Sequence, residues 1–81
     1  MTQPDAVIVI DARGLNCPLP VLRLRKRLQS IAAGQTVELI ATDRAALRDV
    51  PAFCASQGHA VATLSDAGEL RFCVRKAITT P

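Results

Sequence analysis

The residues most able to do chemistry are gathered in the segment GLNCPLP at positions 14–20, which carries a thiol at Cys17. A short apolar run ends just before this segment, and a helical pattern begins within it. The first turn of a helix has backbone N–H groups without intrahelical partners and the positive end of the helix dipole, so it favours an anion. A cysteine there is expected to ionise more readily than a free cysteine. We therefore expect Cys17 to be a nucleophilic thiolate.

The neighbours of Cys17 would shape this site. If Cys17 is the N-cap, Pro18 and Pro20 fall in the first turn, where a missing N–H costs no hydrogen bond. The N–H of Leu19 is then the main one left to face the sulfur. Gly14 allows a sharp turn from strand to helix. The same residues are compatible with an ordinary capped helix whose cysteine is merely small.

Length and composition limit the possible architectures. The 81 residues predict one domain over 1–81, with a core at about 6–77, and the 49% apolar and 21% charged content is typical of a globular chain. The net charge of +3 suggests an acidic partner, protein or RNA. Direct nucleic-acid binding is disfavoured, because stacking on bases needs aromatic side chains and the chain has two phenylalanines and no tryptophan or tyrosine.

The three cysteines, Cys17, Cys54 and Cys73, are widely spaced and predict neither a metal site nor a disulfide framework. No cofactor is expected either. The apolar runs are too short to span a membrane, and no secretory signal is evident, so a cytoplasmic location is expected. We expect Cys54 to be buried and inert, Cys73 to be incidental on a strand, and His59 to serve a turn.

Hydrophobic periodicity predicts six elements. They are a strand at 7–10, a helix at 18–33 capped by Gly34, a strand at 36–42, a turn at 44–48 with a second helix restarting at Asp49 and ending near 57, and strands at 60–65 and 69–76 around a hairpin turn at 66–68. Asp43 and Asp49 are interpreted as helix caps. Val21, Leu24, Leu28 and Ile31 form the apolar face of the first helix.

The order βαβαββ predicts a two-layer α/β sandwich with a small mixed sheet of four strands. The first two strands, joined through a helix, are expected to be parallel. Both helices are expected on one face of the sheet. We assign Ile8, Ile10 and Ile40 to the opposite face.

With these elements in place, the chain resembles the TusA or SirA-like sulfur-carrier family. The resemblance rests on four segments: DARGLNCPLP at 11–20, ATD at 41–43, RDVPAFC at 48–54 and GH at 58–59. It implies the two-layer sandwich with both helices on one side of the sheet. The chain departs from a common family pattern at Arg44 and Ala45, where Pro-Gly often follows the Thr-Asp pair.

The resemblance also implies a function. Cys17 would accept a sulfane sulfur as a persulfide from a cysteine desulfurase or rhodanese-like protein and pass it to an acceptor protein. The family's relays end in tRNA thiolation, molybdenum-cofactor assembly or sulfur oxidation, and the sequence does not choose among them. Such transfer resembles thiol–disulfide exchange and needs an exposed sulfur more than a cavity.

Four cations are candidates for docking a partner. Arg13 precedes Cys17 closely enough to steady a sulfur anion, and Arg23, Lys26 and Arg27 form one stripe of the first helix. Solvated charges explain the same residues. Two other functions remain open: a redox module that oxidises Cys17 as a signal, and a module that binds RNA or protein through the basic helix.

Overall fold

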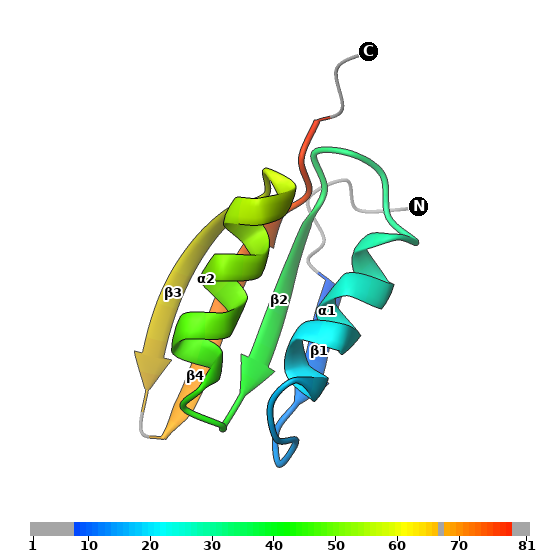
Figure 1. Cartoon of the computed structure of the whole chain (residues 1–81). Coiled ribbons are helices and arrows are strands. Elements are labelled where there is room, and N and C mark those ends of the chain that lie inside the picture. The colour runs from blue at the N-terminus through cyan, green and yellow to red at the C-terminus, as the bar shows by residue number, and fades with distance from the viewer. Residues whose placement is uncertain (1–7, 67, 79–81) are drawn as a thin grey trace.

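The computed structural model describes residues 8–66 and 68–78 of the chain, apart from the side chain of Asp66. Its elements follow the predicted order, strand, helix, strand, helix, strand, strand (Figure 1). Their bounds are β1 (Ile8–Ala12), α1 (Leu19–Leu28), β2 (Thr36–Ala41), α2 (Ala46–Gln57), β3 (Ala60–Asp66) and β4 (Glu69–Arg75). Neither α1 nor α2, the helices of the described residues, has the length and hydrophobicity of a membrane-spanning segment.

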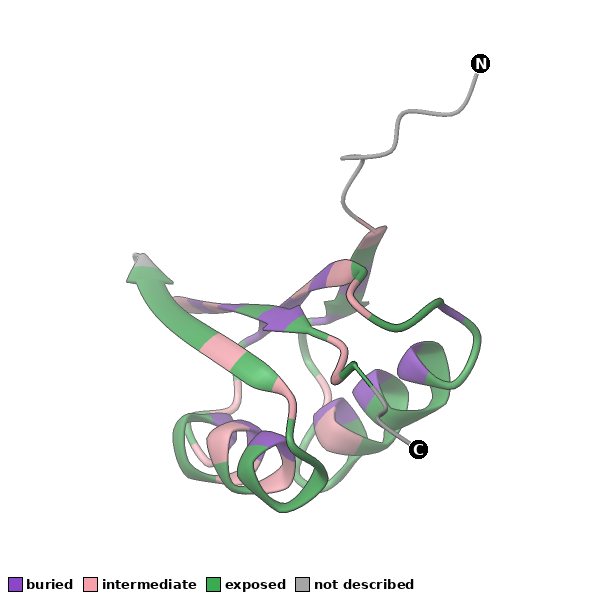
Figure 2. Cartoon of the chain, turned by 90° about the horizontal axis from the view of Figure 1, so that it is seen from above, coloured by how far each residue is buried: buried purple, intermediate pink, exposed green. Residues whose placement is uncertain are grey.

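The four strands form one mixed sheet in the order β1-β2-β4-β3. β1 and β2 are parallel, whereas β4 is antiparallel to both β2 and β3. Both helices lie on the same side of the sheet (Figure 2). The two-layer sandwich, the parallel first pair and the final antiparallel pair are therefore confirmed. Residue 67 of the predicted hairpin turn lies outside the described residues.

The core lies between the helices and one face of the sheet. Alternation along the strands turns Leu39 of β2 and Phe72 of β4 toward the helices, and both are fully buried. Leu24 of α1 and Val50 of α2 meet them from the other layer and are equally buried. Burial of these side chains holds the two layers together, since each contributes roughly 1.5–3 kcal/mol of transfer free energy.

The assignment of Ile8 and Ile10 to the open face is wrong. Ile10 belongs to the core cluster and Ile8 packs against it, because β1 alternates so that even-numbered residues face the helices. Val9 faces the other way and is exposed. Ile40 does lie on the open face, between Asp11 of β1 and Arg71 of β4, yet only 8% of it is exposed.

A chain of ion pairs crosses the open face beside Ile40. The Arg13 guanidinium donates to Asp11 and Glu69, and the Arg71 guanidinium donates to Glu69 and Glu38, at 3.0–3.4 Å. Each exposed pair contributes little to stability by itself. Two of the residues in these pairs, Asp11 and Arg71, lie directly beside Ile40 on the neighbouring strands, where long side chains can cover apolar surface.

The first helix is shorter than predicted. It ends at Leu28 with Gln29 as C-cap, whereas the sequence predicted a helix to residue 33 and a cap at Gly34. Ile31 continues the apolar spacing but is buried from a turn, in which its N–H donates to the Leu28 carbonyl. Gly34 instead has φ +85° and donates its N–H to the Lys76 carbonyl.

The second helix starts earlier than the predicted restart at Asp49 and runs through Pro51. α2 starts at Ala46 with Ala45 as N-cap, so Asp49 lies inside the first turns and is not a cap. Pro51 removes one helical hydrogen bond, yet Ala46, Val50 and Cys54 lie four residues apart on one buried stripe. Packing of that stripe overrides the local cost of the proline.

We expect buried side chains of the central strands to contribute most to the free energy of unfolding. Leu39→Ala should lower the free energy of unfolding by about 2–5 kcal/mol, because the side chain is fully buried in the central strand β2. Leu64→Ala is the matched control: Leu64 is 61% exposed on the edge strand β3, so its loss should cost under about 0.5 kcal/mol. Urea unfolding of both variants measures the difference, and equal losses would contradict this account of the core.

Candidate functional site

The candidate site forms where two loops meet at one edge of the sheet. The chain leaves β1 through residues 13–18 and leaves β2 through residues 42–45. Because β1 and β2 are parallel, their carboxyl ends lie at the same edge. The starts of α1 and α2 therefore lie beside each other, with Cys17 on one loop and Asp43 on the other.

Two hydrogen bonds connect these loops. The Gly14 N–H donates to Thr42 Oγ1 at 2.9 Å, and the Cys17 N–H donates to Asp43 Oδ2 at 2.7 Å. The other oxygen of Asp43 accepts the Ala45 N–H at 3.0 Å. The pKa of Asp43 lies below its usual value because these two backbone N–H groups, first that of Ala45, stabilise the carboxylate. One side chain thus fixes the backbone of Cys17 to the start of α2.

The start of α1 differs from the prediction by one residue. Pro18 is the N-cap, so Cys17 precedes the helix and does not cap it. The Leu19 N–H donates to the Asn16 carbonyl at 2.9 Å and does not face the sulfur. Gly14 has the positive φ of +79° that the sharp turn requires. The Cys17–Pro18 peptide bond is cis.

The thiol of Cys17 is exposed and donates a hydrogen bond to Asp49 Oδ2. This bond is the main cause that raises the pKa of the thiol, and the charges of Asp49 and Asp43 act in the same direction. Correspondingly, the pKa of Asp49 lies below its usual value, mainly because of the bond from Cys17. For Cys17 the direction is opposite to that expected from the helix start, because the bond to Asp49 and the charges of Asp49 and Asp43 favour the protonated thiol.

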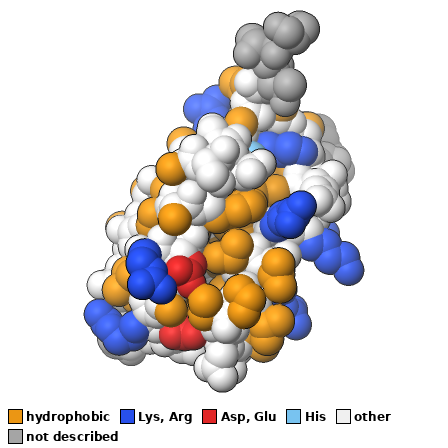
Figure 3. Space-filling view, in the orientation of Figure 1, with side chains coloured by type: hydrophobic (Ala, Val, Ile, Leu, Met, Phe, Trp, Pro, Cys, Tyr) orange, Lys and Arg blue, Asp and Glu red, His pale blue; other side chains and the backbone are white. Residues whose placement is uncertain are grey.

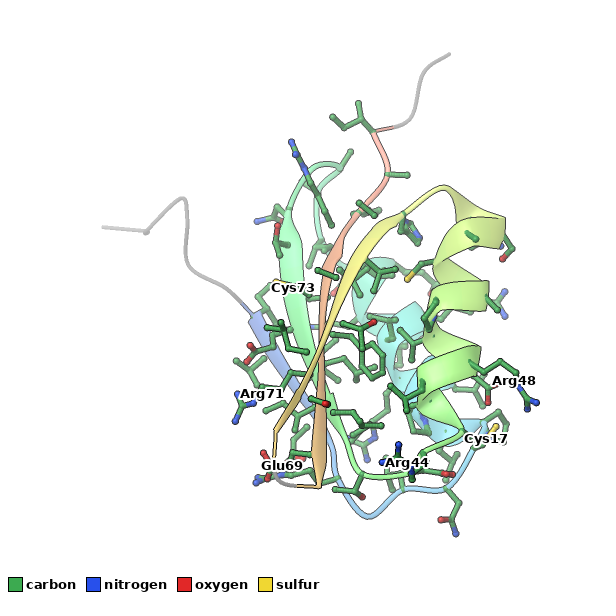
Figure 4. All side chains as sticks on the ribbon, turned by 90° about the vertical axis from the view of Figure 1, so that its left-hand side faces the viewer. Cys17, Arg44, Arg48, Glu69, Arg71 and Cys73 are labelled. Carbon is green, nitrogen blue, oxygen red and sulfur yellow. The ribbon has the colours of Figure 1, made fainter. Side chains whose placement is uncertain are left out.

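Cations and apolar side chains lie around Cys17 and the two carboxylates, Asp43 and Asp49. Arg44 and Arg48 lie near Cys17 at the start of α2 (Figure 4), and the charge of Arg48 partly offsets the effect of the carboxylates on the thiol. Leu19, Leu22 and Leu47 are exposed on the two helices. Figure 3 shows hydrophobic side chains on this face, with acidic side chains between them. Such a surface is suited to contact another protein.

The predicted docking cations do not gather at the sulfur. Arg13 is held by Asp11 and Glu69. These contacts lie on the open face of the sheet, so Arg13 does not serve the thiol through them. Arg23, Lys26 and Arg27 line a groove between α1 and β1.

The remaining candidates have structural surroundings. Cys54 is fully buried, and burial raises the pKa of its thiol to about 11, in line with the predicted inert role. Cys73 is exposed on the open face of the sheet. His59 accepts the Ala77 N–H on Nδ1 at 2.8 Å and lies 5.9 Å from the Phe53 ring, which fits the predicted turn role.

Sequence reasoning missed the acidic surroundings of the thiol. The sequence could have placed Thr42 and Asp43 near Cys17, because they follow a strand expected to be parallel to β1. The contact of Asp49 with the thiol was not predicted, because Asp49 was interpreted as the cap of the second helix. In residues 8–66 and 68–78, no three side chains of His, Cys, Asp or Glu gather as metal ligands.

Known proteins share both the sequence and the fold. The family described as Sulfurtransferase TusA matches residues 8–76. The Sulfur carrier protein TusA of Pseudomonas putida (strain GB-1) is 45% identical over 74 residues, which cover 90% of each chain. That of Pseudomonas paraeruginosa (strain DSM 24068 / PA7) is 42% identical over 78 residues, which cover 94% of this chain and 96% of the other.

A solved structure agrees with these relatives. The crystal structure of a SirA-like protein from Desulfitobacterium hafniense superposes with a TM-score of 0.79 at 26% identity, covering 89% of this chain and all of the other. The match to the family extends from β1 to the end of β4 and includes both loops of the candidate site. The chain therefore belongs to the sulfurtransferase TusA family.

Proposed function

We propose that Cys17 accepts a sulfane sulfur as a persulfide and relays it to an acceptor protein. The observation that carries the proposal is an exposed thiol, fixed through its backbone N–H by Asp43, in a chain whose relatives are named sulfur carriers. Gly14, Pro18, Leu19 and Pro20 shape the loop and helix start that present this sulfur. No enclosed cavity is needed, because both reacting sulfurs belong to proteins.

The transfer is an exchange between sulfurs. The Cys17 thiol first loses its proton, and the thiolate attacks the outer sulfur of the donor's protonated persulfide. The Sγ–S bond of Cys17 forms while the donor's own S–S bond breaks, and the donor leaves as a thiolate. Delivery repeats the exchange with an acceptor thiolate as attacker and Cys17 as leaving group. The carrier starts and ends as a thiol.

The raised pKa of Cys17 affects the reactivity of the empty carrier. An empty carrier holding a thiol reacts slowly with other electrophiles, since the thiolate is the nucleophile. In the Cys17 persulfide, the outer sulfur lies about 2.05 Å beyond Sγ. It is therefore farther from the backbone than Sγ, the atom that Asp49 binds. A partner that displaces Asp49 from the thiol would promote attack.

We propose the sulfur donor and the sulfur acceptor only as classes of protein or process. A cysteine desulfurase or a rhodanese-like protein would supply the sulfur, and tRNA thiolation, molybdenum-cofactor assembly or sulfur oxidation would consume it. The exposed leucines at the helix starts, with Arg44 and Arg48, form the surface around the thiol that both partners would contact. A cytoplasmic location suits a carrier whose thiol must stay reduced.

A redox module is the weaker alternative. It needs a second thiol to resolve the oxidised Cys17. Cys54 is buried, and Cys73 lies on the face of the sheet turned away from the helices (Figure 4). Neither thiol therefore reaches the sulfur of Cys17 in this structure.

Persulfide loading tests the proposal. After incubation with a cysteine desulfurase and cysteine, or with glutathione persulfide, intact-protein mass spectrometry should show a gain of one sulfur atom that dithiothreitol removes. Cys17→Ser should abolish the gain. Cys73→Ser, the matched removal of another exposed thiol, should leave it unchanged. A gain that survives Cys17→Ser and disappears with Cys73→Ser would contradict the assignment.

The carboxylate beside the sulfur predicts a second effect. Asp49→Asn removes a negative charge and an acceptor that favour the thiol, so the pKa of Cys17 should fall. Each unit of fall raises the thiolate fraction at neutral pH about tenfold and lowers its nucleophilicity by about threefold, so alkylation should quicken by about threefold. Rates with iodoacetamide across pH, measured on a Cys73→Ser background, give the midpoint directly.

Glu38→Gln provides the control for this shift. It removes a carboxylate of the open face that is bound to Arg71 and does not contact the thiol. Its alkylation profile should match that of the parent protein. An unchanged or higher midpoint in Asp49→Asn would refute the role assigned to Asp49.

A further inference from the structure

A groove of about 670 Å³ lies between the edge strand β1 and helix α1. Consecutive residues of β1, from Val9 to Asp11, form one wall. The other wall consists of Arg23, Lys26 and Arg27 on one face of α1, with Ser30 in the turn that follows the helix. The groove thus combines the edge of a sheet with a row of cations.

The charges of this groove are available to a ligand. Within the part of the chain that the structure describes, no ion pair involves Arg23, Lys26 or Arg27. The one acidic lining residue, Asp11, already binds the Arg13 guanidinium through both carboxylate oxygens. That contact is the main cause that lowers the pKa of Asp11 to about 2. The groove therefore favours an anionic occupant.

The strand wall favours an extended peptide as that occupant. β1 is the first strand in the sheet order and pairs with β2 on one side. A strand edge offers N–H and C=O groups that an added strand can bind. Val9 is 56% exposed and adds an apolar contact. None of the lining residues is aromatic, so the groove has no platform for stacking nucleic-acid bases.

We propose that this groove binds an acidic, extended segment of a partner protein as an added strand on β1. Acidic side chains at alternate positions would all point toward α1, where the cations lie. A second copy of this chain is disfavoured, because its own β1 edge carries the same row of cations. The inference rests on the proposed function only for the identity of the partner, since a relay needs docking sites besides the thiol.

Peptide binding tests this inference without any sulfur chemistry. The probe is a fluorescein-labelled eight-residue peptide that alternates Glu and Val, acetylated and amidated at its ends. Fluorescence anisotropy should show binding that weakens with salt. A peptide of the same composition, with its four glutamates in one block, should bind more weakly. Equal binding of the two would overturn the added-strand geometry.

Two double variants separate the groove from net charge. Arg23→Glu/Arg27→Glu should weaken binding about tenfold or more, because two facing cations become anions. Arg25→Glu/Arg75→Glu changes the net charge equally, but neither residue lines this groove, so its affinity should stay within about twofold of the parent. Circular dichroism verifies that both fold. Equal effects of the two variants would overturn the proposal.

Backbone pairing and nucleic acid are tested with further probes. Methylating alternate peptide nitrogens in one of the two possible sets should abolish binding, because one set donates to β1; no loss with either set would exclude strand addition. An oligouridylate of eight nucleotides that binds more tightly than the peptide and competes with it would assign the groove to RNA instead. Cys17→Ser should bind the peptide normally, so failure here is distinct from failure of persulfide loading.

Discussion

The arrangement of the site depends on the carboxylate of Asp43. One oxygen binds the N–H of Cys17 and the other binds the N–H of Ala45, so a single side chain joins the loop after β1 to the start of α2. The parallel pairing of β1 with β2 brings these loops to the same edge of the sheet. Once the loops are joined, Asp49 comes into contact with the sulfur. Fold and site are therefore linked through this carboxylate, and the bond from the Gly14 N–H to Thr42 Oγ1 is a second link between the loops.

This link reverses the electrostatics expected of a cysteine near a helix start. The unpaired amides of a helix end favour an anion, but the nearest amides here bind other acceptors: that of Cys17 binds Asp43, and that of Leu19 binds Asn16. Carboxylates then act on the sulfur directly and raise the pKa of its thiol. The carrier proposal consequently rests on exposure, position and family. Ionisation of the free thiol does not support it.

Local sequence patterns predicted which elements form and in what order. Tertiary contacts determined the helix bounds and the partner of the Cys17 thiol. Strand alternation and the β–α–β connection predicted a mixed sheet with a parallel first pair and a final hairpin, but not the strand order β1-β2-β4-β3. The apolar spacing through Ile31 led to a predicted helix that ends five residues too late, because Ile31 is buried from a turn that follows the helix. The helix start predicted at Asp49 was too late, because packing of Val50 and Cys54 on one stripe with Ala46 carries α2 through Pro51. Cys17 was recognised from its neighbours, but its proton is held by a residue 32 positions away, which no local pattern reports.

Titration of Cys17 in the unmodified protein tests the central claim most directly. The carbon-13 shift of its Cβ, followed by NMR from neutral to alkaline pH, reports the thiol of this one residue. We predict a midpoint above that of a free cysteine, because Asp49 and Asp43 favour the protonated form. A midpoint below neutrality would show that the helix start dominates the carboxylates, and would contradict the account given for this site.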